Sequence, residues 1–293
     1  MSTTVNVTPT ARTVEIDGVA TSVIDTGEPP SGASAPPLLL LHGSGPGVTA
    51  LANWRQIIPV LSASRRVIAP DQLGFGGTAT GEPRTYGRGA WTGHALALLD
   101  QLGVDRADVI GNSMGGAIAL SLAAARPSLL RRIVLMGSMG VAMPLPEGLD
   151  GVWRYEPSIE ESRRVIGLFA YNRELITDDL VQMRYEASTR PSVRDSWAAM
   201  FPPPRQRWVD DLALSGAELN AITQPVLLVH GRDDKVVPWS SSAALLDLLP
   251  DARMHILAGC GHWTMIERTA DFLAVVEPFL TGEATTASGN AAR

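Results

Sequence analysis

The sequence holds a single cysteine, Cys260, among its 293 residues. One cysteine cannot build an internal disulfide framework or a zinc site made of several thiolates. The five histidines are scattered and lack the spacing of metal ligands. We therefore predict that the protein uses no metal and no cofactor.

Long apolar runs and a strong charge of one sign are missing too. The longest apolar runs, around 36–41 and 225–229, are far shorter than the about 20 residues of a membrane-spanning helix. Residues 1–12 lack the basic-then-apolar pattern of a secretory signal, so we expect a cytoplasmic protein. Twenty-four Lys and Arg residues against 30 Asp and Glu residues give a net charge of −6. Without a basic stripe, neither nucleic acid nor a membrane is an expected partner.

The chain does contain short apolar runs that alternate with segments of helical periodicity. Runs without polar alternation are typical of strands buried on both faces of a parallel sheet. Residues 89–102 repeat apolar side chains at helical spacing, and a helix of small residues follows Ser113 and stops before Pro127. This order predicts an α/β fold with a mostly parallel central sheet flanked by helices. The predicted strands are 37–43, 65–71, 107–113, 131–138, 225–231 and 252–259.

The alternation breaks within residues 139–211, where we predict helices at 158–170 and 177–189 and no strand. Such a stretch inside an α/β chain is typical of an inserted helical cap, which would enclose a pocket over the strand ends. We therefore predict an α/β core of residues 1–138 and 212–293 and a helical cap, or lid, of residues 139–211. Within the core, residues 1–12 and 281–293 are expected to be flexible.

The segment 111–115 reads Gly-Asn-Ser-Met-Gly and fits the pattern G-x-S-x-G. It follows an apolar strand and opens a helix, and at such a sharp turn the residues beside the serine must be small. This context indicates that Ser113 is a nucleophile, presented near the positive end of a helix. One alternative is a tight turn between strand and helix that performs no chemistry. Another is that Ser113 helps to bind an attacking water molecule and does not itself attack the substrate.

A nucleophilic serine needs a base and an acid that orients the base. His262 follows the last predicted strand, and Asp233 and Asp234 follow the strand before it. The order serine, aspartate, histidine is the order of the α/β-hydrolase fold. The spacing alone leaves both aspartates open, because either could be a solvated turn residue.

Stabilisation of an oxyanion requires backbone N–H donors close to the nucleophile. The segment 42–47, His-Gly-Ser-Gly-Pro-Gly, directly follows a predicted buried strand. We assign one donor to the Ser44 amide and the other to the Met114 amide. The remaining histidines, His42, His94, His230 and His255, we interpret as structural.

These residues resemble the meta-cleavage product hydrolases, which are carbon–carbon bond hydrolases of aromatic degradation within the α/β-hydrolase superfamily. The resemblance covers about residues 14–280, and the predicted cap is most similar to the subgroup that acts on 2-hydroxymuconic semialdehyde and its short 6-alkyl ketone relatives. The motifs HGSGPG, GNSMGG and CGHW are more specific than G-x-S-x-G alone. The matching stretches are 38–55, 71–78, 111–116, 151–188, 201–210, 230–238 and 260–267.

The resemblance implies a role for particular residues. It selects Asp234 as the acid of a triad with Ser113 and His262, and it places Arg184 against the acidic end of the substrate. Met265 departs from the family, which commonly has a polar residue there. The substrate-binding residues that the resemblance implies are Gly43, Ser44, Asn112, Arg184 and Trp263.

The resemblance also implies the reaction. The expected substrate is a small-molecule 2-hydroxy-6-oxo-2,4-dienoate, cleaved to 2-hydroxypenta-2,4-dienoate and a carboxylic acid, and the expected assembly is a homodimer or a higher homo-oligomer. A serine carboxylesterase or lactonase of the same fold is one alternative, and a non-catalytic ligand receptor is another. Haloalkane dehalogenases and epoxide hydrolases are disfavoured, because they usually need an aspartate where Ser113 stands.

Overall fold

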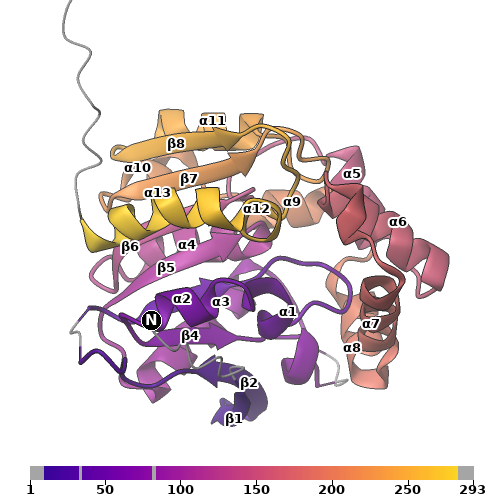
Figure 1. Ribbon diagram of the computed structural model, residues 1–293, viewed down its shortest axis with the longest axis horizontal. Coiled ribbons are helices and arrows are strands. Elements are labelled where there is room, and N and C mark those ends of the chain that lie inside the picture. The colour runs from indigo at the N-terminus through magenta and orange to yellow at the C-terminus, as the bar shows by residue number, and fades with distance from the viewer. Residues whose placement is uncertain (1–9, 33–34, 81–83, 283–293) are drawn as a thin grey trace, which may run out of the picture.

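The computed structural model describes residues 10–32, 35–80 and 84–282. Their centre is an eight-stranded sheet in the order β1-β2-β4-β3-β5-β6-β7-β8 (Figure 1). β3 to β8 run parallel to one another, and β1 and β2 join them in antiparallel pairing. The strands are β1 (Ala11–Ile16), β2 (Val19–Asp25), β3 (Leu38–Leu41), β4 (Val67–Pro70), β5 (Ala107–Asn112), β6 (Leu130–Met136), β7 (Val226–Gly231) and β8 (Ala252–Leu257).

Helices flank the sheet, which confirms the predicted fold class. α4 packs on β5 and β6, α11 on β7 and β8, and α13 on β7. The two predicted core helices are confirmed as α3 and α4. The flanking helices are α1 (Ala50–Trp54), α2 (Ile58–Leu61), α3 (Arg88–Gln101), α4 (Met114–Ala125), α10 (Gly216–Asn220), α11 (Ser240–Leu248), α12 (Thr264–Glu267) and α13 (Thr269–Thr281), with a short 3₁₀ turn at Gly76–Thr78.

All six predicted strands are present, but one of them is not buried as expected. β3, β4, β5 and β7 are buried at every position, because they lie inside the sheet and helices cover both faces. β8 is the edge strand, and Ile256 within it is 42% exposed. The expectation that β8 is buried on both faces is therefore wrong, because a strand at the sheet edge lacks a neighbour on one side.

The hairpin of β1 and β2 was not predicted. Its two strands pair from Ala11 with Ile24 to Ile16 with Val19, around a two-residue turn at Asp17 and Gly18. Both turn residues have positive φ, 48° and 75°, as a tight hairpin turn requires.

The flexible ends were predicted with boundaries that the structure corrects. Ala11 and Arg12 belong to β1 and Thr281 is the last residue of α13, so the flexible segments predicted at 1–12 and 281–293 are wrong at these residues. Each of the three is held by the hydrogen bonds of a strand or a helix. The rest of both segments, apart from Thr10 and Gly282, lies outside the described residues.

Residues 137–225, all of them described, contain helices and no strand, as predicted. The predicted helices are confirmed as α6 and α7, whereas α5, α8 and α9 were not predicted. The division into core and cap at residues 139 and 211 stays a prediction; we use "cap" for the helices α5 to α9, of which α5 to α8 lie together at one end of the strands (Figure 1). They are α5 (Glu147–Trp153), α6 (Ile159–Phe169), α7 (Asp178–Thr189), α8 (Pro191–Met200) and α9 (Gln206–Leu212), with a 3₁₀ turn at Arg173–Leu175.

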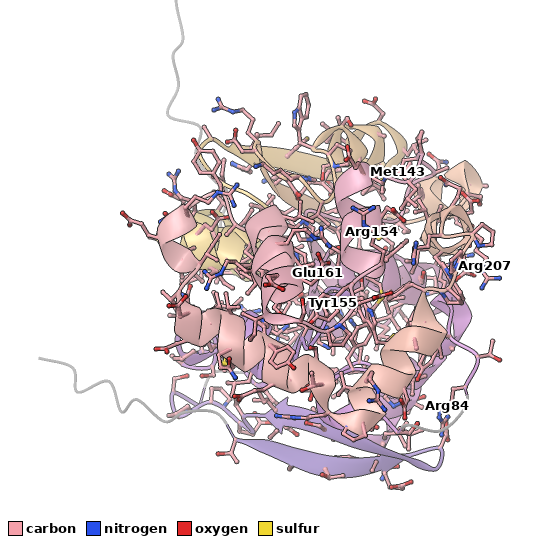
Figure 2. The ribbon with its side chains drawn as sticks, turned by 90° about the vertical axis from the view of Figure 1, so that its right-hand side faces the viewer. Arg84, Met143, Arg154, Tyr155, Glu161 and Arg207 are labelled. Atoms are coloured by element: carbon pink, nitrogen blue, oxygen red, sulfur yellow. The ribbon has the colours of Figure 1, made fainter. Side chains whose placement is uncertain are left out.

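Local sequence explains the two central cap helices. The side chains of Ser158 and Thr177 cap the N-termini of α6 and α7 by accepting backbone N–H groups. Figure 2 looks onto this side of the molecule, where Tyr155 lies near the centre of the face. Its hydroxyl is 2.8 Å from Ser162 Oγ and 2.7 Å from Ser188 Oγ. The Tyr155 hydroxyl therefore joins α6 to α7.

Candidate active site

Ser113 occupies a strained turn between β5 and α4. Its φ of 57° and ψ of −117° are rarely adopted by a residue with a side chain. A Cβ on Gly111 would collide with the carbonyl oxygen of Gly115, and a Cβ on Gly115 would collide with the carbonyl oxygen of Leu41. The two glycines of G-x-S-x-G are therefore required by close backbone approach, and the turn presents Ser113 at the end of the sheet.

His262 and Asp234 form a hydrogen-bonded pair. His262 Nδ1 lies 2.6 Å from Asp234 Oδ2. The other carboxylate oxygen, Oδ1, accepts the backbone N–H groups of Val236 at 2.8 Å and Val237 at 3.0 Å. Burial alone would raise the pKa of the Asp234 carboxyl, but the neighbouring rings of His262 and His230 hold that pKa well below its ordinary value. Asp234 is therefore ionised and fixes the orientation of the His262 ring.

Asp233 points elsewhere, which settles the choice that the spacing left open. Its Oδ2 accepts the backbone N–H of Gly259 at 2.9 Å, and Arg232 lies 3.8 Å from the same oxygen. Asp233 therefore anchors the turn after β8, whereas Asp234 is the aspartate that contacts His262.

One pocket brings together Ser113, His262 and all of the predicted substrate-binding residues. The free volume of this pocket is about 20 Å³, which is on the scale of one water molecule. The described side chains therefore fill most of the pocket. The residues that line the pocket include Gly43, Ser44, Asn112, Ser113, Arg184, His262 and Trp263.

The loop with the predicted oxyanion donors lies against the serine. A Cβ on Gly43 would be 3.1 Å from Ser113 Cβ, so glycine permits this close approach. Met114 is the first residue of α4, where a backbone N–H has no partner within the helix. Ser44 is buried, and its Oγ accepts a hydrogen bond from the indole of Trp153 in α5 at 2.9 Å. The cap thus contacts the loop through Trp153.

His42 braces this loop, as predicted for a structural histidine. Its Nδ1 donates to the Gly43 carbonyl at 2.8 Å, and its Nε2 accepts the backbone N–H of Gln72 at 3.0 Å. Burial is the first reason why the pKa of His42 is lowered. A neutral ring satisfies both contacts and holds the Gly43 backbone in place.

Arg184 places a buried positive charge in the pocket. It lies in α7, only 8% exposed, with its guanidinium carbon 5.5 Å from the centre of the Trp263 ring. Burial, and to a lesser degree the charge of Arg55, lowers the pKa of Arg184 to about 10, so the side chain stays charged at neutral pH. No carboxylate within the described residues pairs with it, and its Nε has no acceptor there. An unpaired buried cation is costly unless an anion joins it.

Two further pocket residues were missed by the sequence analysis. Asn53 in α1 is buried and lines the pocket, and its Nδ2 finds no acceptor among the described residues. Phe169, the last residue of α6, stacks on His262 with ring centres 5.6 Å apart and on Trp263 at 5.0 Å. Neither residue belongs to a motif whose spacing indicates chemistry. Met265, the departure from the family, is fully buried and is not among the residues that line the pocket.

Hydrogen bonds of the backbone and of Glu267 join the C-terminal end of α6 to the loop that carries His262. The carbonyl of Phe169 accepts the backbone N–H of His262 at 2.8 Å. The carboxylate of Glu267 accepts the N–H of Gly261 through Oε1, and those of Tyr171 and Asn172 through Oε2, each at 2.8 Å. The C-terminal end of α6 and His262 therefore hold each other in place.

The described residues contain no group of three or more His, Cys, Asp and Glu side chains that could hold a metal ion. The same part of the chain has no helix that is both long and apolar enough to cross a membrane.

A serine at a strained strand-to-helix turn, followed along the chain by an aspartate–histidine pair at the ends of later parallel strands, defines an α/β-hydrolase. Residues 36–269 match the family model of the alpha/beta hydrolase fold. A 2-hydroxymuconate semialdehyde hydrolase of Pseudomonas sp. (strain CF600) is 48% identical over 92% of this chain and 93% of its own length. A 2-hydroxy-6-oxo-2,4-heptadienoate hydrolase of Pseudomonas putida (strain F1) is 46% identical over 93% and 96%.

The solved structures agree with these relatives. The meta-cleavage product hydrolase of Pseudomonas fluorescens IP01 superposes with a TM-score of 0.88 at 43% identity, covering 92% of this chain and 97% of its own. The chain belongs to the meta-cleavage product hydrolases of the α/β-hydrolase family.

Proposed function

We propose that the protein hydrolyses the C5–C6 bond of a 2-hydroxy-6-oxo-2,4-dienoate that carries a small group at C6. The observation that carries this proposal is the unpaired guanidinium of Arg184 in the pocket of Ser113 and His262. A permanent carboxylate on the substrate supplies the missing partner. Two relatives are named for substrates with hydrogen or methyl at C6, which supports a small group there.

In this proposal the acidic end of the substrate lies against Arg184. A guanidinium can hold a carboxylate with two parallel hydrogen bonds. The free Nδ2 of Asn53 offers one further donor. The Nδ2 of Asn112 already donates to the Met136 carbonyl at 3.2 Å, which leaves its Oδ1 as an acceptor for the 2-hydroxyl group. These contacts would fix the dienoate so that its C6 carbonyl reaches Ser113.

The first chemical step is the conversion of the dienol to its keto form. The proton of the 2-hydroxyl group is lost and a proton is added at C5, which leaves a C3–C4 double bond conjugated with the C2 carbonyl. We assign this proton movement to His262, the base held by Asp234. The keto form matters because it can accept the electron pair of the bond that breaks next.

Ser113 then attacks C6 while His262 takes the serine proton. The C6 oxyanion would lie against the amides of Ser44 and Met114, and removal of one such donor typically costs about 10²–10³ in rate. When C5–C6 breaks, its electron pair moves through C3–C4 to the C2 oxygen, and His262 returns the proton to give 2-hydroxypenta-2,4-dienoate. Water, deprotonated by His262, hydrolyses the acyl-serine, releases the carboxylic acid and restores Ser113.

The experiment that tests this function follows the loss of dienolate absorbance for substrates with hydrogen, methyl, isopropyl or phenyl at C6. We expect the highest kcat/KM for hydrogen and methyl, and nearly complete loss of turnover in Ser113→Ala. An enzyme that cleaves none of the four substrates contradicts the proposal. Faster turnover of simple esters than of every dienoate would favour the carboxylesterase or lactonase instead.

We also propose, from the sequence alone, that the enzyme works in the cytoplasm as a homodimer or a higher homo-oligomer. Light scattering after size-exclusion chromatography tests the assembly, because a monomer has a mass of 31.1 kDa. A mass equal to that of one chain across the micromolar range would contradict it.

A further inference from the structure

His230 is a second histidine on the carboxylate of Asp234. It lies near the end of β7 and is fully buried. Its Nε2 is 3.2 Å from Asp234 Oδ2 and 3.0 Å from the Val237 carbonyl oxygen. Its Nδ1 is 2.7 Å from Ser242 Oγ in α11. Both ring nitrogens are therefore engaged, one of them by the same oxygen that contacts His262.

The partners of the ring decide where its proton lies. A backbone carbonyl and an ionised carboxylate can only accept, so Nε2 must donate. The Ser242 hydroxyl can donate to Nδ1, and a neutral ring with its proton on Nε2 then satisfies every contact. The structure thus assigns a tautomer to His230 without requiring a charge on it.

Two nitrogen atoms lie close to each oxygen of the Asp234 carboxylate. Val236 and Val237 donate to Oδ1, His262 donates to Oδ2, and Nε2 of His230, whose N–H is shared with the Val237 carbonyl, lies 3.2 Å from Oδ2. The donors on Oδ1 are backbone groups and stay in place. On Oδ2, however, His262 has to exchange protons with the serine and the substrate, so its hydrogen bond changes during each turnover. His230 is the neighbour of Oδ2 that takes no part in this exchange.

We propose that His230 is a positioning residue, which keeps Asp234 Oδ2 aligned with His262 Nδ1 while His262 moves protons. The proposal rests on the proposed function, since it assumes that His262 is the working base. His230 does not line the pocket, so its loss should lower kcat and leave KM nearly unchanged. The competing explanation is that His230 only ties β7 to α11 through Ser242.

Paired substitutions separate these explanations. In His230→Gln the side-chain amide nitrogen can reach the place of Nε2, whereas in His230→Asn it reaches only the place of Nδ1. We expect kcat within about threefold of the wild type for His230→Gln and a loss of about 10- to 100-fold for His230→Asn. Ser242→Ala, the matched control, removes the other ring contact and should retain kcat within about threefold. Equal kcat values for the two His230 variants, or an equal loss in Ser242→Ala, would overturn the proposal.

Two further measurements test the positioning role of His230 if His230→Asn fails to fold or if the proposed function is wrong. Long-range proton–nitrogen spectra of the wild-type enzyme should show His230 protonated on Nε2 alone, and a proton on Nδ1 alone would overturn the proposal even if His230→Asn fails to fold. The kinetics are measured with a 4-nitrophenyl ester as well as with the dienoates. A wild type that cleaves only the ester refutes the proposed function, while the comparison of the His230 variants on that ester still tests the positioning role.

Discussion

The turns at the strand ends and the cap contribute to the same pocket in different ways. Ser113, Asp234 and His262 each follow a parallel strand, so the backbone of the sheet determines where they meet. Arg184 and Phe169 come from helices whose faces are set only by packing against the core. The core therefore supplies Ser113, Asp234 and His262, while the cap adds a buried cation and an aromatic ring to the same pocket.

The largest effect should come from the acid in the core. Asp234→Asn should lower kcat by about 10⁴-fold, because the amide cannot stabilise the charged form of His262 or hold its tautomer. Asp233→Asn is the matched control and should keep kcat within about threefold, since the Asp233 carboxylate contacts Gly259 in the turn after β8 and Arg232 instead of His262. Steady-state kinetics of the two variants check this. Similar losses in both would mean that the Asp234–His262 hydrogen bond does not define the active pair.

A smaller effect on kcat/KM is expected at Glu267, which joins the end of α6 to the loop of His262. Glu267→Gln removes one of the two carboxylate oxygens that accept the N–H groups of Gly261, Tyr171 and Asn172. We expect kcat/KM to fall about tenfold and amide hydrogen exchange at Tyr171 and Asn172 to become faster. The exposed Glu160→Gln in α6 serves as the control. Unchanged exchange at both amides would show that Glu267 does not hold the cap.

The smallest effect on activity is expected at His94, which does not line the active-site pocket and whose Nε2 is 2.9 Å from the hydroxyl of Thr21 in β2. Burial, and then the charge of Arg84, lowers the pKa of His94 to about 4 from the ordinary 6.5. The unfolded chain therefore binds the proton more readily, and stability present above pH 6.5 is lost as the pH falls toward 4. The contribution is about 3 kcal/mol at most.

Urea unfolding between pH 4 and 8 tests this dependence. His94→Gln should flatten the slope of unfolding free energy below pH 6.5 and leave kcat at pH 7.5 unchanged. An identical slope in the variant and the wild type would show that His94 is not the group responsible.

The core of the fold was predictable because its physical signals are local. Runs such as Leu38–Leu41 are apolar on both faces, and that pattern is sufficient to indicate an interior parallel strand. The edge position of β8 was not predictable, because burial of an apolar strand depends on whether another strand lies beside it. The hairpin of β1 and β2 does carry a local signal, because Asp-Gly is a typical two-residue hairpin turn.

The residues of the site also divide into those that have a local sequence signal and those that have none. Ser113 was predictable because the strand-to-helix turn demands glycines beside it, and His262 because it directly follows the last predicted strand. Asp233 and Asp234 could not be separated by spacing, because the direction of each side chain depends on the backbone of the turn. Arg184 would be expected on a solvated helix face, and Asn53 carries no signal at all. Only the packing of α7 and α1 against the core buries these two polar groups in one pocket.

We propose above all that the buried guanidinium of Arg184 recognises the carboxylate of a dienoate substrate. The most direct test measures kcat/KM of Arg184→Met for a 6-methyl dienoate and for a neutral 4-nitrophenyl ester. Loss of a charge-assisted hydrogen-bonded pair should lower kcat/KM for the dienoate by about 10²- to 10³-fold, while the value for the neutral ester stays within about threefold. Equal losses on both substrates, or no loss on the dienoate, would contradict the account.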